Sequence, residues 1–237
     1  MTKIKAVLFD LDGTLLPMDQ EPFANAYLGG LVSVAARAGY DTGKMADAVL
    51  RGTAAMVKNT GECSNEAAFW QVLVKAFGQR IVDDYHMFDD FYKTDFQKIK
   101  GICGYEPLAA EVIRTVKARG FRVALATNPL FPTVATESRI RWAGLSPDDF
   151  ELFTTYENSH YCKPNPDYYK EVLSRLGLCA EECIMVGNDV SEDMIAEVLG
   201  MKVFLLTDCL INRKDADISV YPHGGFSELI EYLGSVE

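Results

Sequence analysis

The chain has 237 residues, 49% of them hydrophobic and 24% charged, which is ample material for one large domain or for one core with an insert. Its net charge of −11 and its lack of a basic stripe argue against nucleic acid or an anionic membrane as the main partner. No apolar run approaches the roughly 18 residues of a membrane-spanning helix, and the N-terminus is expected to be a strand rather than a signal peptide. The expected partner is therefore a small molecule, with no role for nucleic acid or membrane.

The cysteines indicate neither a disulfide framework nor a metal cluster. Cys179 and Cys183 are four residues apart, but no histidine and no second cysteine pair completes a zinc site, so zinc is not expected. A reduced, cytoplasmic setting is the simplest account of such scattered residues. The six positions are Cys63, Cys103, Cys162, Cys179, Cys183 and Cys209.

The most informative stretch is residues 7–15, which read Val-Leu-Phe-Asp-Leu-Asp-Gly-Thr-Leu. The apolar run over residues 4–9 is too short for a helix and predicts a buried strand that ends at two acidic residues, Asp10 and Asp12. In an open α/β sheet the carboxyl ends of the strands border the ligand crevice. We therefore expect both carboxylates to belong to a ligand site.

The residues that follow this strand favour a bound cation. Gly13 and Thr14 predict a turn in which the backbone can come close to a ligand. Asp10 and Asp12 repel each other at such short spacing and need a compensating positive charge. Because hard oxygen ligands near phosphate suit Mg²⁺, this is the metal that we expect.

Residues 17 to about 98 carry no convincing strand. Their periodicity is helical and rich in alanine, methionine and leucine, and glycines lie near the breaks, where helix C-termini are expected. The expected helices are Phe23–Ala38, Met45–Val57, Glu66–Phe77 and Ile81 to about Ile99. We expect residues 17–99 to form a compact helical insert.

From Pro107 onward, predicted helices and strands alternate. The expected helices are Leu108–Arg119, Thr133–Trp142, Asp167–Leu176, Glu192–Leu199 and about Phe226–Leu233, and the expected strands are Phe121–Thr127, Phe150–Tyr156, Cys183–Gly187 and Lys202–Thr207. This alternation predicts right-handed βαβ units in a parallel sheet. The predicted fold class is α/β: a Rossmann-like core of residues 1–16 and 100–237, interrupted by an α-helical domain at residues 17–99.

Polar groups follow each of the predicted strands that should meet at the same sheet edge. The second strand ends at Thr127-Asn128, Lys163-Pro164 precedes a helix, and the fourth strand ends at Gly187-Asn188-Asp189, with Asp193 shortly after. Each group alone has an ordinary explanation as a turn, a helix cap or a solvated loop. Their order and shared edge are what is specific: an acid pair, a hydroxyl, a lysine and a second acidic group.

Together with Asp10-Leu11-Asp12-Gly13-Thr14, these groups resemble, in order, the four motifs of the haloacid dehalogenase-like hydrolase superfamily. The resemblance covers the whole chain, and the helical insert corresponds to a cap between the first and second motifs. It implies a Mg²⁺-dependent phosphatase that hydrolyses a small-molecule phosphomonoester through an aspartyl-phosphate.

The resemblance also implies roles for the catalytic residues. Asp10 is expected to be the nucleophile that attacks phosphorus in line, and Asp12 to protonate the leaving oxygen and later to activate water. Thr127 and the Asn128 amide are expected to hydrogen-bond the phosphoryl oxygens. Lys163 is expected to neutralise charge on the nucleophile and on the phosphoryl group.

The metal ligands implied by the resemblance are Asp10, the backbone carbonyl of Asp12 and a group from the fourth motif. An ungapped alignment puts Asn188 where the family usually has an aspartate, with Asp189 beside it. Either Asn188 binds through its carbonyl oxygen, or the loop shifts so that Asp189 binds; the first needs no shift. Asp193 is expected to anchor Lys163 or a metal-bound water.

Three other functions stay open at this stage. A phosphomutase of the same superfamily would keep the phosphoryl group for re-donation. A dehalogenase is less favoured, because halide displacement needs no acid at Asp12. A binding or regulatory protein that has lost turnover is the rival from another class, with Asn188 as its hint. The substrate depends on cap side chains that no motif identifies, and the sequence does not define the oligomeric state.

Overall fold

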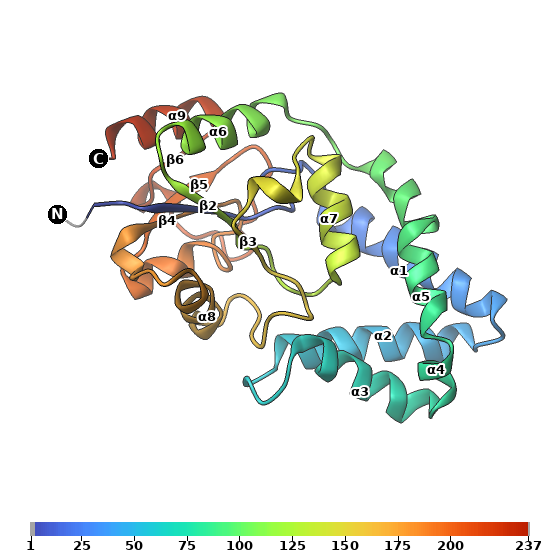
Figure 1. Ribbon diagram of the computed structural model, residues 1–237. Helices are drawn as coiled ribbons and strands as arrows, with labels where there is room; N and C mark the ends of the chain where they lie inside the picture. Colours follow the sequence, from blue (N-terminus) through green and yellow to red (C-terminus); the bar gives the residue numbers. More distant parts are fainter. Residues whose placement is uncertain (1–2, 237) are drawn as a thin grey trace.

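The computed structural model describes residues 3–236 and contains one six-stranded parallel sheet (Figure 1). The strand order is β3-β2-β1-β4-β5-β6, so the first strand of the chain lies between later ones. The expected α/β fold with a parallel sheet is confirmed. The strands are β1 (Ala6–Phe9), β2 (Arg122–Leu125), β3 (Leu152–Phe153), β4 (Cys183–Gly187), β5 (Lys202–Leu206) and β6 (His223–Gly224).

The register of the central strands determines which residues meet at the sheet edge. Phe9, the last residue of β1, pairs with Leu125 of β2 and with Val186 of β4. Asp10 continues this alignment, because its N–H donates to the Val186 carbonyl at 2.9 Å. The residues that follow β1, β2 and β4 therefore emerge at one edge.

Alternate strand residues contribute to two separate hydrophobic clusters, one on each face of the sheet. In β1, Val7 and Phe9 belong to one cluster, and Ala6 and Leu8 belong to the other. Buried side chains on both faces are typical of parallel sheets covered by helices on both sides. One face carries α6 (Pro107–Ala118), α7 (Thr133–Trp142) and α9 (Phe226–Ser235); the other carries α8 (Pro166–Leu176) and the 3₁₀ helix η4 (Met194–Leu199).

The segment between β1 and α6 is helical, and residues 20–102 contain no strand. Figure 1 shows α2, α3 and α4 lying away from the sheet, with α1 and α5 nearer to α7. Side chains of Asp19, Asp41 and Ser64 cap the first three helices by accepting backbone N–H groups. The helices are α1 (Gln20–Arg37), α2 (Thr42–Val57), α3 (Asn65–Phe77), α4 (Arg80–Asp83) and α5 (Tyr85–Lys93), followed by the 3₁₀ helix η1 (Asp95–Ile102).

The expected single helix over residues 81–99 is wrong, because the structure breaks it twice. Asp84, between α4 and α5, has φ −90° and ψ 15°, and its carboxylate accepts the Tyr40 hydroxyl at 2.6 Å. Thr94, between α5 and η1, has φ −124° and ψ −80°, and its hydroxyl donates to the Asp90 carbonyl. These breaks fold the aromatic side chains of α5 and η1 together, as in the Phe91–Phe96 contact. Tertiary packing overrides the helical periodicity here.

Two predictions near the site also differ from the structure. The strand expected over residues 150–156 is reduced to Leu152–Phe153, because Thr154 turns its hydroxyl toward the Thr127 carbonyl, 2.6 Å away. The α-helix expected over residues 192–199 is a 3₁₀ helix that begins at Met194. The two-residue strand β6 was not predicted, since it is too short to show a pattern. Within residues 3–236 no helix is both long and apolar enough to span a bilayer, and the six cysteines are all free thiols.

Candidate active site

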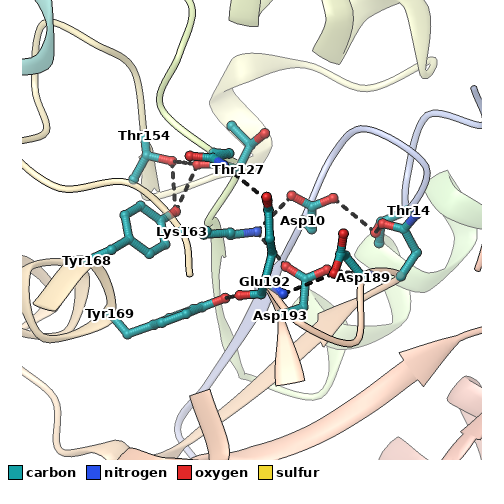
Figure 2. A network of polar contacts seen from close by, with 12 residues as sticks. Asp10, Thr14, Thr127, Thr154, Lys163, Tyr168, Tyr169, Asp189, Glu192 and Asp193 are labelled. Carbon is teal, nitrogen blue, oxygen red and sulfur yellow. Dashed lines mark hydrogen bonds and ion pairs between the residues drawn. The ribbon is translucent and has the colours of Figure 1, made fainter. Parts of the chain in front are cut away.

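The structure brings most of the predicted site residues together at the carboxyl edge of the sheet. Figure 2 shows the Lys163 side chain reaching between Asp10, which follows β1, and Asp193, which precedes η4. The Lys163 ammonium donates to Asp10 Oδ1 at 2.9 Å and to Asp193 Oδ1 at 2.6 Å. All three residues are buried.

The charges of this cluster fix Lys163 as a cation. Burial alone would lower the pKa of Lys163, but the carboxylates of Asp10 and Asp193 raise it well above its ordinary value. Burial raises the pKa of Asp193 to about 7, against the opposing charge of Lys163. Charge-assisted hydrogen bonds of this kind are stronger than neutral ones. Asp10 therefore lies against a permanent positive charge.

Asp10 also shares a hydrogen-bond partner with Asn188. The Thr14 hydroxyl lies 3.1 Å from Asp10 Oδ2 and 3.1 Å from Asn188 Oδ1, and it has a single hydrogen to donate. Asn188 Nδ2 donates to the Cys209 carbonyl at 2.6 Å, which fixes the amide so that Oδ1 faces the Thr14 hydroxyl. Two hard oxygens thus converge with only one hydrogen between them, and such a pair can bind a cation.

Gly13 makes this approach possible. Its φ of +86° lies in the left-handed region, and a Cβ there would lie 2.3 Å from Asn188 Nδ2. Any other residue at this position would push Asn188 away from Asp10 and Thr14. The glycine of the first motif therefore positions a residue of the fourth.

Asp189 is engaged elsewhere, although it lies next to Asn188. Its Oδ1 accepts the backbone N–H groups of Ser191 and Glu192 at 2.7 and 3.0 Å, and its Oδ2 pairs with Arg213 at 3.0 Å. Both carboxylate oxygens of Asp189 are thereby engaged, one within its own loop and the other by the loop after β5. This geometry favours Asn188 over Asp189 as the metal ligand of the fourth motif.

The donor set can be compared with the needs of Mg²⁺. Within residues 3–236 no three or more histidine, cysteine, aspartate or glutamate side chains gather as a metal site. The expected set of one carboxylate, one backbone carbonyl and one amide oxygen forms no such cluster. Since Mg²⁺ is usually held by one or two carboxylates and keeps several waters, the oxygens of Asp10 and Asn188 fit it.

Asp12 lies in a different environment from Asp10. One of its oxygens, Oδ2, is paired with the guanidinium of Arg139, which is fully buried and stacks on the Phe131 ring at 4.3 Å. The other, Oδ1, has no hydrogen-bond partner among residues 3–236. Burial raises the pKa of Asp12, and Arg139 opposes the rise. A carboxyl group with a raised pKa and one open oxygen is suited to carry a proton.

Sequence reasoning missed Arg139 and Glu192. Arg139 belongs to no motif, and its one signal is a cation on the face of α7 that also buries Ala135 and Ile140. Glu192 accepts a hydrogen bond from Asn128 Nδ2 at 3.0 Å, and burial raises the pKa of its carboxyl group. Nothing in the sequence separates Glu192 from an ordinary first-turn acid.

Thr127 and Cys162 lie in two loops around the site. Thr127 is buried, and its carbonyl accepts the hydroxyls of Thr154 and Tyr168, at 2.6 and 2.9 Å, so these contacts hold the loop after β2 in place. Cys162 precedes Lys163 in the chain, but burial raises the pKa of its thiol to about 12. The cysteine is therefore a neutral packing residue, and no nucleophile.

A cavity of about 340 Å³ adjoins these residues. Its lining includes Asp12, Asn128 and Glu192 from the sheet edge, and side chains of α1, α2, α3 and α5 from the helical segment. The cavity therefore links the acidic residues with the segment inserted after β1.

The fold and the site together define an α/β enzyme with an acidic pair and a buried lysine at the carboxyl edge of its sheet. The sequence-family model of the haloacid dehalogenase-like hydrolases matches residues 4–196 of this chain. The chain belongs to this family, as its motifs predicted. It is 22% identical to a 2-haloacid dehalogenase from Pseudomonas syringae pv. tomato DC3000, whose crystal structure it matches with a TM-score of 0.64 over 98% of each chain.

Two curated relatives are phosphatases by name. A ribulose-1,5-bisphosphate 5-phosphatase of Halopiger xanaduensis is 26% identical over 95% of this chain and 98% of its own. A glyceraldehyde 3-phosphate phosphatase of Methanocaldococcus jannaschii is 28% identical over 55% of this chain. The chain spans between 20% and 57% of the length of the first three curated relatives that it matches.

Proposed function

We propose that this chain is a Mg²⁺-dependent phosphatase that hydrolyses a small-molecule phosphomonoester through an aspartyl-phosphate on Asp10, with residues 17–99 as the cap domain. The observation that carries the proposal is the buried Asp10 carboxylate, 2.9 Å from Lys163 and 3.1 Å from the Thr14 hydroxyl, at the carboxyl end of β1. A carboxylate in this setting can attack phosphorus.

In the first step an Asp10 oxygen forms a bond to phosphorus, and the bond from phosphorus to the ester oxygen breaks. Asp12 delivers its proton from Oδ1, the open oxygen, to the departing alcohol. Lys163 remains against Asp10 and offsets charge on the phosphoryl oxygens, and the Thr127 hydroxyl and the Asn128 backbone N–H donate to those oxygens.

In the second step Asp12, now a carboxylate, takes a proton from water. The water oxygen bonds to phosphorus, and the Asp10 carboxylate leaves, so inorganic phosphate is released and both aspartates are restored. Arg139, paired with Asp12 Oδ2, stabilises the carboxylate form that this step requires.

The metal would be held by Asp10, the backbone carbonyl of Asp12 and Asn188. When bound, Mg²⁺ supplies positive charge that aligns the phosphoryl group with Asp10 and offsets the negative charge of the transition state. Asp193 would act through Lys163, whose position it fixes.

The names of the two phosphatase relatives support chemistry at a phosphate ester, although each name describes that protein alone. The likeness to a dehalogenase structure at 22% identity concerns the fold. Halide displacement has no use for a proton donor, whereas the raised pKa of Asp12 and its open oxygen support ester cleavage.

The test is hydrolysis of p-nitrophenyl phosphate by the wild type and by Asp10→Asn. The variant is nearly isosteric, but an amide is a very poor nucleophile, so turnover should fall by at least about 1000-fold while the fold persists. Asp47→Asn, which alters an exposed aspartate of α2, should match the wild type. Wild-type turnover should vanish in chelator and return with Mg²⁺. Activity of Asp10→Asn within tenfold of wild type would refute the assignment of Asp10 as the nucleophile.

A further inference from the structure

We propose that the leaving group of the substrate is an uncharged, largely apolar alcohol with an aromatic ring, so that the natural substrate is an arylalkyl or aryl phosphate. This inference rests on the proposed phosphatase function. It is carried by the cavity of about 340 Å³ beside Asp12, which is large enough for a small ligand.

The first argument is the composition of the cavity wall. Aromatic side chains come from both the helical segment and the sheet side, among them Trp70, Phe88 and Phe131. A planar ring of a ligand can stack on the faces of these side chains or contact their edges. Leucine and valine side chains, together with Met18 and Ala24, supply about half of the remaining lining residues. The cavity therefore favours apolar surface on the ligand.

The second argument is charge. Among the described residues that line the cavity there is no lysine, arginine or histidine, and the two ionisable carboxyl groups are those of Asp12 and Glu192. A leaving group with its own carboxylate or second phosphate would be desolvated beside these acids without a cation. Burying an unpaired charge is strongly unfavourable. The cavity therefore selects against a second anionic group.

The third argument is that several polar groups of the wall are already paired, although the buried Trp70 Nε1–H has no hydrogen-bond partner among residues 3–236. The Tyr27 and Tyr92 hydroxyls hydrogen-bond each other at 2.9 Å, and the Thr53 hydroxyl donates to the Val49 carbonyl at 3.0 Å. Gln20 Oε1 accepts a hydrogen bond from Arg213 at 3.0 Å. A sugar would bury several hydroxyls here with few partners, and unpaired buried groups are costly.

Besides the Trp70 Nε1–H, two oxygens of residues that line the cavity remain open. Asp12 Oδ1 and Asn128 Oδ1 are buried, and neither has a hydrogen-bond partner among residues 3–236. Asp12 Oδ1 is reserved for the ester oxygen in the proposed first step. Asn128 Oδ1 is free to accept a hydrogen bond from a ligand. The hydrogen bond from its amide nitrogen to Glu192 fixes the orientation of the side chain. The leaving group can thus carry one donor, such as a hydroxyl, near its ester oxygen.

The test compares 4-isopropylbenzyl phosphate, 4-carboxybenzyl phosphate and glucose 6-phosphate, with p-nitrophenyl phosphate as a reference. The methylene group insulates the ester oxygen, so the first two differ mainly in charge at similar size. We expect kcat/KM for the isopropyl ester to exceed that for each of the other two by about 100-fold or more. As a second readout, the Asp10→Asn variant should bind 4-isopropylbenzyl alcohol more tightly than 4-(hydroxymethyl)benzoate in calorimetry.

A variant that adds a cation to the wall should change this preference. Leu50 lines the cavity from α2 yet is 58% exposed, so Leu50→Lys can be accommodated. It should raise kcat/KM for the carboxybenzyl ester by about tenfold, whereas Leu50→Met, the uncharged control, should keep the wild-type order of substrates.

The outcomes separate this inference from the proposed function. Equal turnover of all three esters, or a preference for the charged or the sugar ester, would overturn the inference and leave the phosphatase assignment intact. Failure to hydrolyse every ester, the reference included, would overturn the proposed function, and the inference with it.

Discussion

Asp10 and Asp12 are two residues apart, yet their surroundings suit them to different proposed roles, one as nucleophile and the other as acid and base. Asp10 lies against the ammonium of Lys163, which is placed to offset negative charge on the proposed nucleophile. Burial raises the pKa of Asp12, and Arg139, with a smaller contribution from Lys163, opposes the rise. Separate environments for two neighbouring carboxyl groups are how one site provides both a nucleophile and an acid.

Arg139 is the positioning residue in this pair, and its removal should shift the pH dependence. In Arg139→Met the partly buried Asp12 loses its paired guanidinium, so its pKa rises further. Because Asp12 must be protonated to donate, the alkaline limb of the kcat/KM profile should move to higher pH. The second step needs the Asp12 carboxylate, so kcat near neutral pH should fall by about tenfold or more, part of the roughly 10²–10⁴-fold that general acid–base catalysis contributes.

The matched control is Arg141→Met, which removes an exposed arginine from the same helix, where it pairs with Glu137. It should leave the pH profile in place. If Arg139→Met is less stable but keeps the wild-type pH profile, Arg139 has only a structural role.

Substitutions of Asn188 and Asp189 are expected to change the Mg²⁺ requirement differently. Asn188→Asp adds a charged oxygen beside Asp10 and should lower the Mg²⁺ concentration for half-maximal activity by about tenfold, equivalent to about 1.4 kcal/mol. Asp189→Asn should change that concentration by less than about threefold, a difference below about 0.7 kcal/mol. Titration of Mg²⁺ against activity measures both. A large Mg²⁺ defect confined to Asp189→Asn would identify Asp189 as the ligand instead.

At the scale of elements, the helical segment is joined to the core through the first turn of α3. The Asn65 and Glu66 N–H groups donate to the carbonyls of Ser159 and Tyr156, both at 2.8 Å. The fully buried Asn65 side chain reaches the Pro129 and Tyr161 carbonyls at 3.4 and 3.3 Å. The start of one helix thus fixes the segment to the loops that flank the site.

Replacing Asn65 should loosen this attachment. Asn65→Ala leaves buried carbonyls without a donor and should lower the free energy of unfolding by about 1–3 kcal/mol, as measured by denaturant titration. It should also raise KM more than it lowers kcat, because the cavity wall is formed by the same segment. Gln71→Ala, at an exposed position of α3, is the control and should change neither. Unchanged stability in Asn65→Ala would show that α3 is held by other contacts.

The sequence was most informative where function and periodicity coincide. The central strands and helices follow from buried apolar runs, and α7 and β4 have the expected bounds, Thr133–Trp142 and Cys183–Gly187. The motif residues were located because strand ends in a parallel sheet share an edge. Arg139 was missed, since its contact with Asp12 joins residues 127 positions apart and leaves no local pattern. The helix breaks at Asp84 and Thr94 were not predicted for a similar reason, because tertiary packing of aromatic side chains determines them.

At the scale of the whole molecule, the sheet carries the proposed chemistry and the inserted helices form much of the cavity wall. The long insertion between β1 and β2 places these helices over the carboxyl edge without disturbing the pairing of β1 with its neighbours. The proposed reaction requires a covalent step on Asp10, followed by hydrolysis that depends on Asp12. This order is the central claim, and it can be observed by slowing the second step alone.

The measurement is the pre-steady-state reaction of Asp12→Asn with p-nitrophenyl phosphate and Mg²⁺. Nitrophenolate leaves without a proton donor, so the first step proceeds, whereas hydrolysis lacks its base. We expect a burst of about one nitrophenolate per protein molecule, and acid-quenched protein heavier by one phosphoryl group, located by peptide mass spectrometry on Asp10. The Asp10→Asn/Asp12→Asn double variant should show no burst. A burst whose phosphoryl group lies on another residue, or that persists in the double variant, would contradict the account.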